Sequence, residues 1–261
     1  MSEAAAIRHQ RSEGSIGLSA GPQGLRNLRE SGAAKLRLPI GSSEAILINT
    51  GGGLAGGDRF RFDIAAEAGA RLTVTSQAAE RVYRTLGPAA TIDVKLKAGA
   101  GASLSWLPNE SILFDGASLS RSISVDLAVD ARFLGVESVV LGRAASGEIV
   151  RHAKLNDRWR IARAGKLIFA DDLAFEGAPP KTLATLADAR AFATIVLADA
   201  HAEQFIDRVR AEIGASGSAS AWSGKLVARL CARDGFELRK ALIPALSVLT
   251  GGAGLPKTWS F

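Results

Sequence analysis

The sequence predicts a mainly β protein of stacked β-sheets with β-helical, solenoid-like character and about two helices in the C-terminal third. Three observations lead to this fold class. Apolar and polar residues alternate over much of the chain, which is the pattern of half-buried strands. A short string of residues recurs after about thirty positions, as in stacked repeats. Helical spacing of apolar residues is confined to the last third of the chain.

The strands follow from the alternation of period two. In the segment 59–64, Phe60, Phe62 and Ile64 alternate with charged residues, and the segments 91–97 and 122–129 show the same pattern. Because the segments follow one another closely without intervening helices, a doubly wound α/β sheet is excluded. Further strands, most of them bounded by Gly, Pro, Asn or Asp, are expected at 35–38, 45–50, 72–75, 104–107, 133–141, 148–155, 166–175 and 192–197.

The internal repeat links two of these strands. The string A-G-A-R-L-T-V at 68–74 recurs as A-G-A-S-L-S-W at 100–106, with a weaker third copy at 130–136. A period near thirty residues fits the coils of a β-solenoid or stacked sheets. Two copies can equally arise by chance in a chain that is rich in Ala and Gly.

Two helices are expected near the C-terminus. Segment 200–213 carries apolar residues at helical spacing and ends at Gly214, a usual stop signal. Segment 236–249 predicts a second helix, which Pro244 should bend or split. Between them, the segment 214–220 contains only Gly, Ala and Ser and is expected to be a flexible loop.

Composition indicates one domain in a reducing compartment. Residues 1–15 are expected to be a flexible lead-in, and residues 16–261 a single β domain, with neither a secretory signal nor a transmembrane segment. The single Cys231 excludes an internal disulfide, which favours the cytoplasm. The net charge of +6 is spread thinly, so we expect acidic protein partners and neither a nucleic acid nor a membrane.

A glycine-rich segment at 51–56 matches the G-x-G-x-x-G pattern of dinucleotide-binding loops. Such a site needs a helix that begins at the last glycine, because the helix N-terminus holds the pyrophosphate. Here the strand 59–64 follows instead, and Asp58 stands where a phosphate-binding loop needs Lys. The segment is therefore expected to be a tight connection between strands.

Carboxylates are the acid groups left for polar chemistry, because the three histidines are isolated in the sequence. Glu137 lies in a segment that should be buried, so it must be paired, and Arg143 is the nearest candidate partner. Spacing does not separate structural ion pairs from a glycosidase-like carboxylate pair or from oxygen ligands for a divalent cation. The candidate carboxylates are Asp58, Glu80, Glu110, Asp115, Glu137, Glu148, Asp171 and Asp172.

Five strings, taken together and in order, resemble one family, that of the urease accessory protein UreD, also called UreH. The resemblance covers about residues 35–261 and departs from the family pattern at Ser76, where Thr is usual, and at Ser146, where Met is common. The strings are N-T-G-G-G-L-A-G-G-D at 49–58, S-Q-A-A-E-R-V-Y-R at 76–84, L-P-N-E-S-I-L-F-D-G-A at 107–117, L-G-R and G-E at 141–143 and 147–148, and L-P-K-T-W at 255–259.

The resemblance implies a non-enzymatic nickel metallochaperone scaffold in the cytoplasm. Proteins of this family bind UreF, which recruits the GTPase UreG, and they also contact the urease apoprotein. By this resemblance the chain is expected in a dimeric UreD-UreF-UreG complex. Nickel would be in transit and GTP would be bound by UreG, so no tightly bound cofactor is expected.

The same resemblance suggests a water-filled passage for nickel. Asp58, Gln77, Glu137 and Glu148 are the candidates that line it, because oxygen ligands bind Ni(II) weakly enough to release it. Asp58 equally fits an Asx-type turn that closes the glycine-rich loop. The residues expected in the polar interior beside them are Arg143, Tyr83 and Asp115.

Two alternatives stay open. A β-solenoid enzyme that acts on carbohydrate would also carry buried carboxylates, although it needs a long groove with aromatic residues. A metal-independent scaffold that only opens urease for loading fits the same sequence. The two expected helices, 200–213 and 236–249, are candidates for the contact with UreF.

Overall fold

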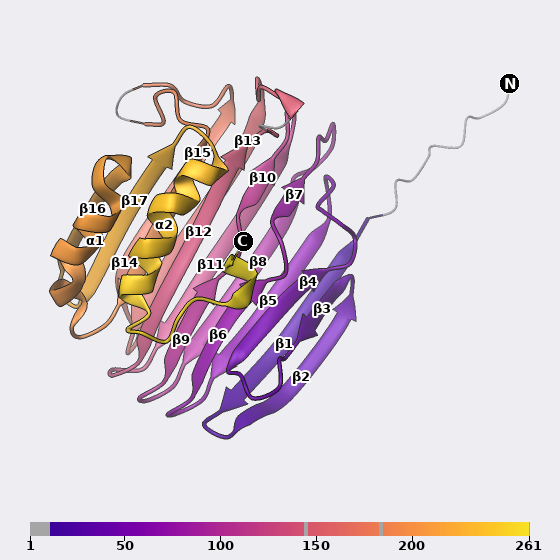
Figure 1. Ribbon diagram of the computed structural model, residues 1–261. Helices are drawn as coiled ribbons and strands as arrows, with labels where there is room; N and C mark the ends of the chain where they lie inside the picture. Colours follow the sequence, from indigo (N-terminus) through magenta and orange to yellow (C-terminus); the bar gives the residue numbers. More distant parts are fainter. Residues whose placement is uncertain (1–10, 144–145, 183–184, 261) are drawn as a thin grey trace, which may run out of the picture.

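The computed structural model describes residues 11–143, 146–182 and 185–260, and it contains two packed sheets with helices on one outer face (Figure 1). The first is a 7-stranded sheet with the strand order β14-β13-β11-β8-β5-β1-β2. Its strands are β1 (Glu13–Gly21), β2 (Gly24–Gly32), β5 (Arg59–Ala66), β8 (Ala90–Ala98), β11 (Ser118–Leu127), β13 (Ala153–Arg163) and β14 (Lys166–Gly177).

The second is a 10-stranded sheet whose main path runs β16-β17-β15-β12-β9-β6-β4-β3, while β10 pairs with β12 and β7. Its strands are β3 (Ala34–Arg37), β4 (Glu44–Asn49), β6 (Arg71–Ser76), β7 (Glu80–Val82), β9 (Ser103–Leu107), β10 (Ser111–Leu113), β12 (Arg132–Leu141), β15 (Ala191–Ala198), β16 (Gly217–Trp222) and β17 (Lys225–Ala232). The mainly β architecture expected from the sequence is thus confirmed.

The residues of the internal repeat form the corner at which each coil passes from one sheet to the other. From β5 the chain turns into β6, from β8 into β9 and from β11 into β12, and each strand pairs in parallel with its equivalent in the next coil. Leu72 lies opposite Leu104, which in turn lies opposite Phe133. The corners stack directly, since the Gly69 amide donates to the Ala100 carbonyl at 2.8 Å. This arrangement confirms the β-solenoid interpretation of the repeat.

The two long edges of the sandwich differ in their connections. Along one edge, short turns at 67–70, 99–102 and 128–131 join the sheets. Along the other edge, the chain returns through longer segments that carry the family-like strings, including 77–89 and 108–117. The parallel stack is followed at both ends by antiparallel strands: β2 and β3 at one end, and β14 and the group β15, β17 and β16 at the other.

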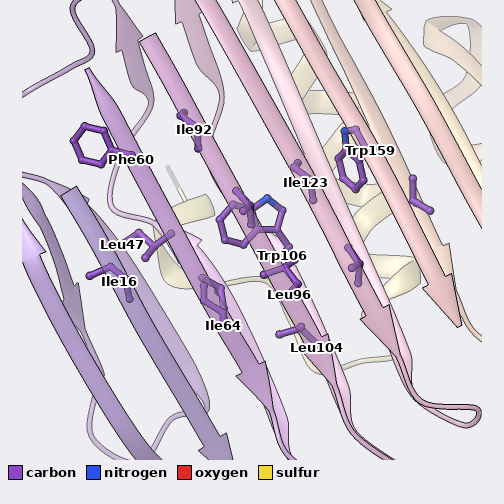
Figure 2. Packing of buried hydrophobic residues seen from close by; sticks show 14 of the residues in the cluster. Ile16, Leu47, Phe60, Ile64, Ile92, Leu96, Leu104, Trp106, Ile123 and Trp159 are labelled. Carbon is purple, nitrogen blue, oxygen red and sulfur yellow. The ribbon is translucent and has the colours of Figure 1, made fainter. Parts of the chain in front are cut away.

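The main core fills the space between the sheets. Trp106 and Trp159 lie among aliphatic side chains from both layers, as Figure 2 shows. Both tryptophans and Leu104 are almost completely buried. Burial of so much apolar surface is the dominant stabilising contribution to such a sandwich.

A second core lies on the outer face of the 10-stranded sheet, where α1 (Ile206–Ile213) and α2 (Gly235–Leu249) pack. Short 3₁₀ helices adjoin them: η2 (Ala202–Phe205), η3 (Gly214–Ser216) and, near the C-terminus, η4 (Lys257–Trp259). Strands β12 and β15 are therefore buried on both faces, which explains their continuous apolar sequences. None of the helices among the described residues is long and apolar enough to cross a membrane.

The two expected helices are present, although the segment 200–213 begins with the 3₁₀ helix η2 and becomes α-helical only at Ile206. Helix α2 begins after Asp234, whose side chain accepts a hydrogen bond from the Glu237 amide at 2.9 Å, a typical N-cap. It continues through Pro244 as one helix to Leu249, so of the two expected effects of Pro244, a bend or a split, the split does not occur. Packing against the sheet compensates for the backbone hydrogen bond that Pro244 cannot donate.

Three expectations about local structure are corrected. The segment 214–220 is not a loop but contains η3 and β16, because β17 offers a free edge to which small residues can pair. The strand expected at 148–155 begins only at Ala153, and β17 itself was missed. In the expected lead-in 1–15, residues from Glu13 belong to β1, whereas residues 1–10 lie outside the described part of the chain.

Two leucines test the interior of the sandwich. Leu104→Ala should lower the free energy of unfolding by about 2–5 kcal/mol, because the side chain is 0% exposed and leaves a cavity. Leu86→Ala makes the same chemical change at a side chain that is 95% exposed and should cost less than about 0.5 kcal/mol. Urea unfolding followed by tryptophan fluorescence measures both. Equal effects of the two changes would contradict the position of β9.

Candidate functional site

A partly open cavity of about 210 Å³, lined by both apolar and polar side chains, lies between the sheets, toward the edge with the longer connections. Both sheets contribute to it: Arg121 comes from β11, Glu137 from β12 and Glu80 from β7. Its apolar wall includes Phe60, Phe62 and Trp106, and its polar lining comprises Asn49, Ser76, Gln77, Glu80, Arg81, Asn109, Ser111, Arg121 and Glu137. The cavity therefore combines carboxylate and amide oxygens with two guanidinium groups.

Arg121 forms the inner wall together with two carboxylates. Its Nε and Nη2 atoms donate to the two oxygens of Asp157 at 3.0 and 2.5 Å, and Nη1 pairs with Glu137 Oε2. Nη1 also donates to Ser111 Oγ at 3.2 Å. The other Glu137 oxygen accepts from Trp106 Nε1 at 2.7 Å. Each of these charged groups is buried and hydrogen-bonded, as buried charges must be.

Burial and pairing act in opposite directions on this cluster. Loss of hydration raises the pKa of Glu137 to about 7, although the attraction of Arg121 opposes the rise. The pKa of Arg121 is raised, because Asp157 and Glu137 outweigh the desolvation that would lower it. Arg121 thus stays charged. The expectation that Arg143 pairs with Glu137 is wrong, because Glu137 pairs with Arg121 and Arg143 pairs with Glu148.

Glu80 and Asn49 form another part of the lining. Asn49 Nδ2 donates to Glu80 Oε1 and to the Gly53 carbonyl, both at 3.1 Å. Burial raises the pKa of Glu80 to about 7, because the hydrogen bond from Asn49 only partly offsets the desolvation. Gly53 is required here: at φ +147° a Cβ would lie 2.4 Å from the Tyr83 ring. Gln77 lies beside this group and is exposed, so the cavity opens to solvent there.

Asp58 lies outside the cavity lining and closes the glycine-rich loop. Its Oδ2 accepts from the Ala55 amide at 2.8 Å, and its Oδ1 accepts from the Ser12 amide at 2.7 Å. The side chain is 3% exposed, and both oxygens are used by the backbone. The geometry therefore matches the loop-closing alternative, in which Asp58 holds a connection between strands.

Glu148 and Asp115 organise a surface loop instead of the cavity. Glu148 Oε2 accepts from Arg143 Nε at 2.8 Å, and this pairing holds the pKa of Glu148 below its usual value although burial opposes it. Asp115 accepts from the amides of His152 and Arg151, which lower the pKa of its carboxyl group. Neither carboxylate lines the cavity. The ion pair of Arg143 with Glu148 and the hydrogen bonds of Asp115 link the segment that ends at Arg143 to the segment 148–152.

Tyr83 lies at the rim of the glycine-rich loop. Its hydroxyl donates to the Gly52 carbonyl at 3.0 Å, and its ring meets the edge of Phe114 at a centroid distance of 5.3 Å. It is 37% exposed and fixes the loop from outside. Of the four candidate path residues, the structure brings Gln77 and Glu137 together in the cavity and places Asp58 and Glu148 elsewhere.

The donor set does not form a tight metal centre. Within the described ranges, no group of three or more His, Cys, Asp or Glu side chains is arranged to hold a metal ion. The described residues that line the cavity contain neither His nor Cys. Oxygen donors of this kind bind first-row divalent cations weakly compared with imidazole or thiolate.

Three of the five family-like strings meet at the cavity. Asn49 and Gly53 come from the first string, Gln77 and Glu80 from the second and Asn109 from the third. The closing string supports them from behind: Trp259 Nε1 donates to the Leu107 carbonyl at 2.9 Å, and the hydroxyls of Thr258 and Thr75 lie 2.9 Å apart. Segments far apart in the sequence thus converge on one place.

Comparison with known proteins decides the family. The model of the UreD urease accessory protein family matches residues 11–260. The chain is 48% identical to the urease accessory protein UreD of Rhizobium etli over 98% of each protein. It is 46% identical to that of Agrobacterium fabrum, over 90% of this chain and 85% of the relative, and 42% identical to UreD 1 of Brucella abortus, over 94% and 91%.

The chain belongs to the UreD family of urease accessory proteins. The resemblance based on the five strings is therefore confirmed. The relatives are named as accessory proteins, which favours a role in urease maturation over the alternative of a carbohydrate-active enzyme.

Sequence reasoning missed two members of the buried cluster, Arg121 and Asp157. Both occupy inward positions of alternating strands: Arg121 lies between the buried Leu119 and Ile123, and Asp157 lies between Leu155 and Trp159. The expected strand 122–129 began one residue too late to include Arg121. Both residues could have been found in the sequence, because each is a charged residue at a position of the alternating pattern that otherwise holds buried apolar residues.

Glu80 gives a testable pH dependence in this UreD family member. Its carboxyl pKa is raised, so the folded protein holds a proton that the unfolded chain releases between about pH 4.5 and 7. The contribution of Glu80 to the free energy of unfolding therefore falls as the pH rises through this window. Glu80→Gln removes the titration, so its free energy of unfolding relative to wild type should rise by roughly 1–3 kcal/mol between about pH 5 and pH 8.

Urea unfolding at the two pH values measures this difference. Glu176→Gln is the control, because that carboxylate is exposed and outside the cavity, and its effect should vary much less with pH. A Glu80→Gln effect that is the same at both pH values would show that Glu80 is ionised and solvated in the folded protein.

Proposed function

We propose that the chain is a non-catalytic scaffold for urease nickel-centre assembly in the cytoplasm. In this proposal it binds UreF, UreG and the urease apoprotein in a dimeric UreD-UreF-UreG complex. It assists GTP-dependent delivery of nickel, with GTP bound by UreG and nickel only in transit. The chain itself needs no tightly bound cofactor.

The observation that carries the proposal is the convergence of three family-like strings on one polar cavity. A structural core would be filled by apolar side chains, since unfilled polar space between sheets is costly. Here the polar side chains of Glu80, Asn49, Asn109 and Glu137 line a space that water or a cation can enter. A cavity of this kind supports passage of a small cation more readily than a purely structural role.

The donor chemistry supports transit over storage. Ni(II) binds imidazole and thiolate more firmly than it binds single carboxylates and amides. A path that must release its cargo needs weak successive contacts, as in ion channels. Within the proposal, Gln77 and Glu137 belong to the path, whereas Asp58 and Glu148 hold loops next to it.

The helical layer is the proposed contact for UreF. Helices α1 and α2 cover the outer face of the 10-stranded sheet, and Phe236 on α2 is 60% exposed. Helix-on-helix packing is available to a helical partner at this face. The cavity and the helices share the 10-stranded sheet, so a partner at the helices would be close to the residues of β12.

Reconstitution tests the proposal. Urease activation with added nickel is measured after co-expression of apo-urease, UreF and UreG with and without this chain, and pull-down reports complex formation. Activation should depend on the chain. If the chain neither binds UreF nor changes activation, the proposed function is wrong.

A matched pair of variants separates a nickel path from a metal-independent scaffold. Ala78→Trp places a large ring at the exposed opening of the cavity and should lower activation several-fold while pull-down of UreF is retained. Ala100→Trp makes the same change in an exposed turn on the opposite edge and should leave activation unchanged. Wild-type activation by both variants would favour the metal-independent scaffold.

A further inference from the structure

We propose that the surface formed by segments 84–89, 115–118 and 151–154, the loop platform, docks an acidic surface of the urease apoprotein. Two exposed arginines of the loop platform meet carboxylates of that partner, and an exposed leucine enters an apolar depression in it. The inference rests on the proposed function in taking apo-urease as a partner. It gives that partner a place of its own, separate from the helices proposed for UreF.

Backbone hydrogen bonds join the three segments of the loop platform into one unit. The Thr85 amide donates to the Gly116 carbonyl at 3.0 Å, and the Gly116 amide donates to the His152 carbonyl at 2.7 Å. The Lys154 amide donates to the Ala117 carbonyl at 2.9 Å. Because the segments already hold one another in place, binding of a partner loses little conformational entropy.

The loop platform surrounds an open depression of about 650 Å³. Leu86 belongs to its lining and is 95% exposed, so this side chain has few contacts within the chain. The turn that carries it is ordered by a hydrogen bond from the Gly87 amide to Thr85 Oγ1 at 2.9 Å. A partner that covers Leu86 would remove its apolar surface from water, which favours binding.

The charge of the loop platform is one-sided. Its segments contain the basic Arg84, Arg151 and Lys154 and a single acidic residue, Asp115. The Asp115 carboxylate is used internally, because it accepts from two backbone amides of the third segment. Lys154 pairs with Glu176 at the end of β14. A net positive charge therefore remains, and it belongs to the two arginines.

Arg84 and Arg151 are the groups left for a partner. Both side chains are exposed, and within the described ranges neither forms an ion pair. Arg143 on the same edge differs, because it is paired with Glu148. Guanidinium groups bind carboxylates in a bidentate manner, and arginine is enriched at protein interfaces. The chemistry of the loop platform thus fits an acidic protein surface.

The position of the loop platform indicates which partner it fits. Its segments lead into β8, β11 and β13 of the 7-stranded sheet, whereas the helices proposed for UreF cover the outer face of the other sheet. It lies on the edge with the longer connections, where Gln77 is exposed at the opening of the cavity. Under the proposed function nickel leaves this chain for apo-urease, so the recipient docks at the edge where the cavity opens.

Charge reversal tests the two arginines. Arg84→Glu combined with Arg151→Glu should weaken the binding of apo-urease at least about tenfold, because repulsion replaces attraction and association slows. The matched control is Arg29→Glu combined with Arg71→Glu, which makes the same change in net charge at exposed arginines outside the loop platform. Arg84→Lys combined with Arg151→Lys retains the charge and should associate at close to the wild-type rate.

Leu86→Ala tests the apolar contact separately. The change should hardly affect stability, because the side chain is exposed, but it should weaken the binding of apo-urease several-fold. Ile40→Ala is the control: Ile40 is also exposed, lies in the connection between β3 and β4 and should leave binding unchanged.

The full-length chain is immobilised, and the binding of apo-urease and of UreF is followed separately by biolayer interferometry. Urea unfolding checks that each variant is folded. Because salt screens exposed charges, the loss caused by the double reversal should be larger at about 50 mM than at about 300 mM NaCl. The binding of UreF should be the same for every variant.

Three results would overturn the inference: wild-type binding of apo-urease by the double reversal, an equal loss in the control pair, or loss of UreF binding instead. If the double reversal does not fold, Arg84→Gln combined with Arg151→Gln is measured in the same way and should show a smaller, salt-dependent loss. A wild-type chain that binds neither apo-urease nor UreF would overturn the proposed function, and this inference with it. Binding that is insensitive to these substitutions would overturn only the inference.

Discussion

The contact between Arg121 and Glu137 joins the two sheets through a buried ion pair. Most of the core between the layers consists of apolar side chains, which are interchangeable within limits of volume. A buried ion cluster has no such tolerance, because loss of one partner leaves an uncompensated charge. The relative position of β11, β12 and β13 is therefore constrained by this cluster, and the space beside it remains open.

Much of the fold could be predicted because its sequence signals are local. The strands at 59–64 and 91–97 alternate cleanly, since one face of each meets the core and the other meets solvent. The sequence did not predict strand β16, because most of its residues are small and show no alternation of large apolar and polar side chains. Its conformation depends on pairing with β17. Tertiary pairing decided its conformation, and no local propensity could show it.

The candidate site was predictable only in part for a related reason. Gln77 lies in a string with a family resemblance and Glu137 in a strand expected to be buried, and the structure does bring them together. The partner of Glu137 was assigned to Arg143 by sequence distance, whereas Arg121 reaches it across the sandwich. Contacts between coils depend on the register of the stack, and a single sequence does not specify that register.

The unequal edges of the sandwich differ in how far an inserted residue would be transmitted. Short corners such as 99–102 stack on one another, so an inserted residue there would shift the strands of every following coil. The opposite edge joins the sheets through longer segments, two of which contain the short strands β7 and β10. An inserted residue should therefore disturb the sheets more at the stacked corners than in the longer segments of the opposite edge.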